Sequence, residues 1–161
     1  MKDRTYFLAQ TLFDLISQKT SKAVLRINYI VAIRLAQKWM NDYGLWVDRR
    51  RSEILGRPVY KNSKQLFSDG YFTNKQVNDH ERHCLQVLGW RVNQTTLYDY
   101  VETMAHEIKV RSPDLSDEEY TRLRARAILQ AKLASHCTEI LEDFSYEDIA
   151  KTCIWLALDC M

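Results

Sequence analysis

The chain has 161 residues, which is enough for one domain, or for one domain and part of another. Its 23 basic and 21 acidic residues give a net charge of +2, far from the strongly basic balance of many nucleic-acid-binding proteins. No apolar stretch approaches the ~20 residues that a membrane-spanning helix needs. These features argue against nucleic-acid and membrane functions.

The composition predicts an all-α protein. Hydrophobic residues make up 46% of the chain and charged residues 27%, while only four glycines and two prolines interrupt it. The four cysteines form no C-x-x-C pair, and the first residues, MKDRTYFLAQ, lack the apolar core of a signal peptide. We therefore expect reduced cysteines and a nuclear or cytoplasmic location, or both.

The first half of the chain predicts two helices and a connection. Residues 5–18 carry an apolar stripe at helical spacing, and residues 22–41 are apolar nearly all round, which is typical of a central helix wrapped by neighbours. Residues 42–72 have a weak pattern and most of the glycines, so we expect a long, protease-sensitive connection. Two short helical pieces are expected within it, near 46–55 and 62–68.

Helix-start signals divide the second half. Thr73 and Gln76 form a capping box for a helix over 73–89, which Gly89 ends. Thr95 or Thr96 begins a helix over 94–110. Its expected inward residues are Tyr100, Val101, Met104 and Ile108.

Two further helices are expected at the end of the chain. Ser116 and Glu119 form another capping box for one long helix over 116–141, and Ser145 caps a last helix over 145–159. On that last helix, Ala150 is expected at a close helix crossing. Ile154 and Trp155 are expected to point inward.

Three motifs resemble the cyclin family. In the helix over 73–89, Glu81 precedes an L-x-x-L-x-[WF] run, and Thr96 opens the next helix, as in the fourth and fifth helices of a cyclin box. The central helix ends in a pattern similar to L-A-x-K-[YF]-E-E, with Met40 and Asn41 in place of the two acidic residues. The last helix, DIAKTCIWLALD, resembles a helix of the second cyclin repeat. The residues that carry the first two motifs are Leu35, Ala36, Lys38, Trp39, Glu81, Leu85, Leu88, Trp90 and Thr96.

The resemblance implies a cyclin-like helical repeat. Residues 1–112 would form a first cyclin box without its first helix, and residues 113–161 the start of a second repeat. The missing helix would leave one side of the helix over 22–41 bare, ready for a partner. It would also remove the substrate-docking motif that the first helix carries in cell-cycle cyclins.

The resemblance also implies a function. The chain would be a regulatory subunit that binds and activates a cyclin-dependent protein kinase, without being an enzyme or needing a cofactor. Lys38 would pair with Glu81 on the neighbouring helix, and the pair would keep spare hydrogen bonds for the kinase backbone. The implied kinase-binding residues are Leu35, Lys38, Trp39, Glu81 and Tyr100.

Other interpretations of the same residues stay open. A Lys38–Glu81 pair also occurs as an ordinary surface salt bridge, and Tyr100 as an ordinary core aromatic residue. The chain could be a cyclin-fold adaptor of transcription machinery, or a decoy that occupies a kinase without activating it.

Two remaining features give weaker signals. His80, His83 and Cys84 share a helix, but no second pair of ligands has matching spacing, so we expect no metal site. Arg49–Arg51 is a short basic run; such runs occur in nuclear-import signals and in sites for acidic partners, but more often in solvated turns. No catalytic motif is present in the sequence.

Overall fold

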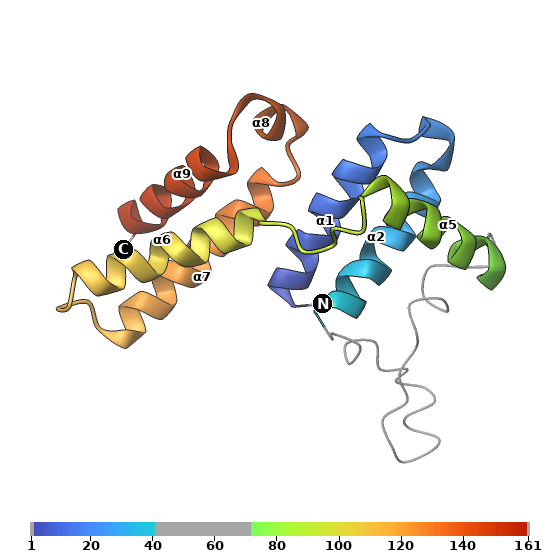
Figure 1. Cartoon of the computed structure of the whole chain (residues 1–161). Coiled ribbons are helices and arrows are strands. Elements are labelled where there is room, and N and C mark those ends of the chain that lie inside the picture. Colours follow the sequence, from blue (N-terminus) through green and yellow to red (C-terminus); the bar gives the residue numbers. More distant parts are fainter. Residues whose placement is uncertain (1, 41–71, 161) are drawn as a thin grey trace, which may run out of the picture. The chain divides into compact units, whose positions relative to one another are not determined.

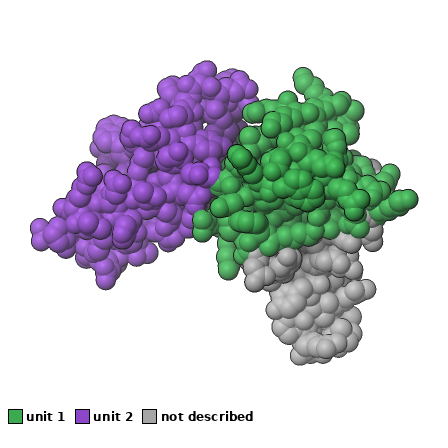
Figure 2. Space-filling view, in the orientation of Figure 1, with its two compact units in different colours: residues 1–94 green, residues 95–161 purple. Residues whose placement is uncertain are grey.

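The computed structural model describes residues 2–40 and 72–160 (Figure 1). Every regular element among them is a helix, which confirms the all-α prediction. The chain divides into two compact units, residues 1–94 and residues 95–161 (Figure 2). The expected helical pieces near 46–55 and 62–68, the protease-sensitive connection and Arg49–Arg51 lie outside the described residues.

Within its described residues, 2–40 and 72–94, unit 1 contains three α-helices and a short 3-10 helix. They are α1 (Asp3–Gln18), η1 (Lys22–Val24), α2 (Leu25–Trp39) and α5 (Asn74–Val87). α2 packs against both α1 and α5 and is buried along most of its length, as expected for a central helix. The core side chains come from all three helices, including Leu12 of α1, Val31 of α2 and Val77 of α5.

Some large apolar side chains of α2 nevertheless reach the surface. Leu25, Tyr29 and Trp39 are exposed in the described structure, and the ring of Tyr29 meets that of Phe13 edge-on. That a partner protein covers a bare side of this helix stays a prediction.

Unit 2 contains four α-helices. They are α6 (Leu97–Arg111), α7 (Asp117–Ala134), α8 (Thr138–Asp143) and α9 (Tyr146–Asp159). α6, α7 and α9 pack against one another in pairs. Small buried residues lie on each of these three helices, including Ala105, Ala127 and Ala150, and they allow the helices to approach closely. Ala150, which was expected at a close helix crossing, has no exposed surface.

Most of the helix-start signals are confirmed. Complete capping boxes join Thr73 with Gln76 and Ser116 with Glu119, and the Ser145 hydroxyl accepts from the Asp148 amide. Thr96 rather than Thr95 is the N-cap of α6. Its capping box is closed by Asp99, which was not predicted from the sequence.

The helix over 73–89 ends at Gly89 as expected. The Gly89 amide donates to Gln86 O and the Trp90 amide to Leu85 O, the pair of bonds that defines a Schellman cap. Gly89 has φ +58°, the left-handed conformation that glycine adopts without strain. Trp90 follows with φ +62°, which is uncommon for a residue with a bulky side chain.

The prediction of one long helix over 116–141 is wrong. α7 ends at Ala134, and a break at Ser135 to Cys137 separates it from α8. The Ser135 hydroxyl donates to Lys132 O and its amide to Ala131 O, so this residue ends α7. Serine, histidine, cysteine and threonine are weak helix formers and follow one another at residues 135–138, but neither glycine nor proline marks the break.

One other expectation differs from the structure. Trp155 is 63% exposed, although Ile154 beside it is buried as predicted.

The expected boundary between two cyclin repeats at residues 112 and 113 stays a prediction. The compact units of the structure divide between Gln94 and Thr95. The reason for this division is that α6 buries Leu97, Val101 and Ala105 in unit 2, where it packs against α7 and α9.

Candidate functional site

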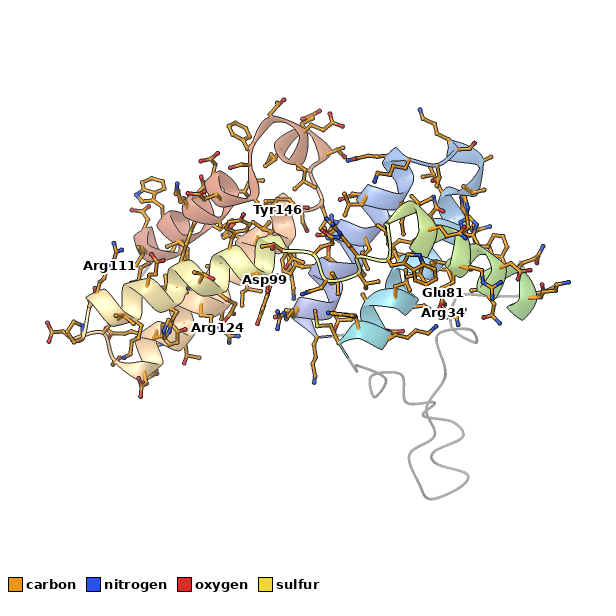
Figure 3. All side chains as sticks on the ribbon, in the orientation of Figure 1. Arg34, Glu81, Asp99, Arg111, Arg124 and Tyr146 are labelled. Atoms are coloured by element: carbon orange, nitrogen blue, oxygen red, sulfur yellow. The ribbon has the colours of Figure 1, made fainter. Side chains whose placement is uncertain are left out.

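A cluster of polar side chains joins α2 to α5. Lys38 donates a hydrogen bond from Nζ to Glu81 Oε1, so the juxtaposition that the sequence resemblance implies is confirmed. Arg34, one turn earlier on α2, lies on the other side of the same carboxylate, with Nη2 3.2 Å from Glu81 Oε2. Figure 3 shows Arg34 and Glu81 together where α2 meets α5. We call Arg34, Lys38, Asn78 and Glu81 the α2–α5 cluster.

Asn78 completes the cluster by binding Arg34. Its Oδ1 accepts from both Nη1 and Nη2 of Arg34, each at 3.3 Å. The contact between Arg34 and Glu81 Oε2 is ionic without hydrogen-bond alignment, and this buried oxygen receives no hydrogen bond from the described residues. Asn78 and Glu81 are three residues apart, which places them on one side of α5.

Exposure increases across the cluster from Arg34 to Lys38. The side chains of Arg34 and Glu81 are 7% and 13% exposed, whereas that of Lys38 is 44% exposed. Arg34 is therefore held as a buried cation, which requires a nearby anion. Among the described residues the ammonium of Lys38 donates to Glu81 alone, and its two other hydrogens have no acceptor there.

Two of the other predicted binding residues flank Lys38 in the chain. Trp39 is 53% exposed and offers an apolar surface at the end of α2, one residue after Lys38. Leu35 is 4% exposed and belongs to the core of unit 1. A partner can therefore touch Trp39 directly, while Leu35 supports the end of α2 from within.

Tyr100, the fifth predicted residue, belongs to unit 2. It is half-buried on α6 and lines a pocket of about 550 Å³ between α6 and α9. Met104 and Ile108 follow it at one-turn spacing and line the same pocket, so these expected inward residues are only half-buried. Glu147 and Lys151 contribute from α9 and form an ion pair with each other at 2.6 Å.

A second polar connection between α2 and α5 runs through a buried asparagine. His80 Nε2 lies 2.7 Å from Asn28 Oδ1, and Asn28 Nδ2 donates to Thr20 Oγ1 at 2.7 Å. The Thr20 hydroxyl uses its single hydrogen to donate to Ile16 O, so it accepts from Asn28. Because Asn28 donates through Nδ2 to Thr20, its Oδ1 can only accept a hydrogen bond. His80 Nε2 must therefore carry a proton.

The histidines of α5 show no metal centre. The His80 and His83 rings lie 5.8 Å apart, but no group of three or more potential ligands is arranged to hold a metal ion in the described part of the chain. Burial, and then the neighbouring His83, lowers the pKa of His80. Nor is any described helix long and apolar enough to cross a membrane.

Besides the hydrogen bonds that join Thr20, Asn28 and His80, sequence reasoning missed two polar networks. One is the part that Arg34 and Asn78 play in the α2–α5 cluster, although an arginine in an otherwise apolar stretch, IVAIRLA, was a signal that it needs a buried partner. The other joins α6 to α7 in unit 2. There Arg124 Nε donates to Glu102 Oε1 at 2.6 Å and its Nη2 to the Tyr98 hydroxyl at 3.0 Å.

Three comparisons with known proteins found no match. No protein family, curated protein or solved structure matches the chain.

Proposed function

We propose that the chain is a cyclin-like regulatory subunit that binds and activates a cyclin-dependent protein kinase. One observation carries the proposal: Lys38 and Glu81 are paired across α2 and α5, as the resemblance to cyclins requires, and the exposed Trp39 follows Lys38 in the chain. The rest of the support is the run of cyclin-like motifs in the sequence.

The proposed mechanism uses binding free energy and no chemistry of the chain's own. The pair would offer its remaining hydrogen bonds to the backbone of the kinase, and Trp39 would add apolar contact. Binding would hold the regulatory helix of the kinase in its active position, so that the kinase's own Lys–Glu pair forms. Tyr100 is the fifth residue proposed to contact the kinase.

The test is a binding and activity assay with a panel of purified cyclin-dependent kinases. Lys38→Ala is expected to weaken kinase binding by about 2–5 kcal/mol, because it removes a charged group from a desolvated contact. Lys22→Ala makes the same change of charge in η1, just before the start of α2, and serves as the matched control. It is expected to leave binding unchanged.

The outcomes separate the proposal from its rivals. Activation of a bound kinase, lost in Lys38→Ala, supports the regulatory subunit. Binding without activation supports the decoy. Failure to bind any kinase in the panel, or equal binding by both lysine variants, counts against the α2–α5 cluster as a kinase-binding surface and favours the adaptor.

A further inference from the structure

The charges of the α2–α5 cluster do not cancel. Two cations, Arg34 and Lys38, share the single carboxylate of Glu81, which leaves a net charge of +1. Because Arg34 and Glu81 are nearly buried, the group that presents this charge to solvent is the Lys38 ammonium. A simple Lys38–Glu81 pair would instead be neutral.

Neighbouring residues extend the positive surface along α5. Lys75 and Arg82 are exposed and stand at i−3 and i+4 from Asn78, so they lie along the same side of the helix. Asp79 is the exposed acidic residue of this stretch and stands at i+4 from Lys75 and i−3 from Arg82, so these three residues together add a net charge of +1.

An apolar contact is available at the same end of α2. Trp39 follows Lys38 directly in the chain and is about half exposed. An exposed indole one residue from a surface cation gives two points of contact to a partner that carries both an acidic and an apolar group.

We propose that the α2–α5 cluster and Trp39 bind an acidic, amphipathic segment of a partner protein, with a carboxylate at Lys38 and an apolar side chain on Trp39. This inference refines the proposed function, on which it rests, by naming the chemistry of the segment that docks there. The occupant follows from charge complementarity: a net-positive patch attracts a carboxylate and repels a basic segment.

Arg34 is the positioning residue of this surface. It occupies the buried side of the Glu81 carboxylate, and its guanidinium keeps its charge when buried. Glu81 is therefore shared between two cations, and Lys38 keeps an excess of positive charge for the partner. Arg34 itself is too deep to touch the partner.

The test uses the full chain and two synthetic peptides of about 15 residues, a length at which helix formation becomes possible. One is an amphipathic peptide of Leu, Ala and Glu, and the other carries Gln in place of every Glu. Binding is followed by NMR through the signals of the Trp39 indole N–H and the Lys38 side chain. We expect the acidic peptide to bind about tenfold more tightly, the size of one charge-assisted hydrogen bond.

Salt and variants then test the role of Arg34. Raising the salt concentration from about 0.01 to 0.15 M shortens the screening length from about 30 to about 8 Å, and should weaken binding of the acidic peptide in the native chain. In Arg34→Met this salt dependence should become shallower, whereas a purely structural role for Arg34 would leave it unchanged. Arg34→Lys should restore the native salt dependence. This variant also keeps the test possible if Arg34→Met does not fold. Arg91→Met, which removes an exposed arginine after the end of α5, is the matched control.

The outcomes are decisive and independent of the kinase assay. Equal binding of both peptides, no binding of the acidic one, or an unchanged salt dependence in Arg34→Met overturns the inference. Shifts of the same two signals by a short DNA duplex, without any by the acidic peptide, would assign the patch to nucleic acid and also overturn it. If only this inference fails, kinase binding through backbone carbonyls still stands. If only the kinase assay fails, the acidic-segment surface stands without a kinase.

Discussion

Arg34 Nη2 lies 3.2 Å from Glu81 Oε2, on the buried side of a carboxylate whose other oxygen accepts a hydrogen bond from Lys38. Glu81 therefore does more than form a surface salt bridge with Lys38. It is also the counter-ion of a buried guanidinium, and this second role dominates its contribution to the stability of the fold.

The two members of the predicted pair should thus differ in their effect on stability. Glu81→Ala is expected to lower the free energy of unfolding by about 3–5 kcal/mol, because it leaves Arg34 buried without an anion. Lys38→Ala removes only the exposed partner and should cost less than about 1 kcal/mol. Urea denaturation of the two variants measures both values, and equal losses would show that Arg34 does not depend on Glu81.

The last helix gives a prediction about packing. Ala150 is fully buried on α9, so Ala150→Leu should overpack its surroundings and cost about 1–3 kcal/mol. Trp155→Ala, on the same helix, removes a side chain that is largely exposed and should change the free energy of unfolding far less. Similar melting temperatures for native protein and Ala150→Leu would contradict this arrangement.

Local signals in the sequence predicted the helices of the described regions well. Capping boxes at Thr73 and Ser116 depend on residues three apart, so short-range spacing is enough to find them. The break after α7 was missed because Ser135 ends that helix through its own side chain, without a glycine or proline. Trp155 was misplaced because an apolar residue type does not by itself fix the side of a helix that it occupies.

The candidate site could be predicted only in part, for a similar reason. The juxtaposition of Lys38 and Glu81 followed from a family pattern, not from spacing. Arg34 and Asn78 lie outside that pattern, and they come together only through the crossing of α2 and α5. A long-range contact of this kind has no signature within a short stretch of sequence.

The end of α5 predicts opposite effects for two adjacent residues. Gly89→Ala should destabilise the protein by about 1–2 kcal/mol, because alanine is strained at φ +58° although a Cβ there would meet no atom within 4 Å. Trp90→Gly should relieve the same strain at φ +62° and gain up to about 1 kcal/mol. Thermal unfolding of both variants tests this, and a stabilising Gly89→Ala would contradict the left-handed cap.

Thiol reactivity should follow burial. Burial raises the pKa of Cys84 to about 12, helped by the Glu81 charge, and that of Cys153 to about 11, so both stay protonated at pH 8. Cys160 is exposed and all four cysteines are free. We expect a thiol-alkylating reagent to label Cys160 first and Cys84 and Cys153 only after unfolding, as read by mass spectrometry of digested protein. Early labelling of Cys84 would show that the interior of unit 1 opens easily.

The lowered pKa of His80 predicts a loss of stability on acidification. The unfolded chain binds a proton at His80 near the ordinary pKa of about 6.5, whereas the folded protein resists protonation there until a lower pH. The unfolded state therefore takes up more protons in this window, and the free energy of unfolding falls as the pH drops below about 6.5. The stability that the protein gains from keeping His80 neutral is fully present above about pH 6.5, the ordinary pKa of histidine.

His80→Gln isolates this effect. Glutamine does not titrate, and its amide can still donate to Asn28 Oδ1, so the buried chain to Thr20 can be kept. The slope of unfolding free energy against pH between about 6.5 and 5 should become shallower in this variant. His106→Gln, at an exposed position on α6, is the matched control and should keep the native slope. If both variants keep it, His80 protonation is not what weakens the fold in acid.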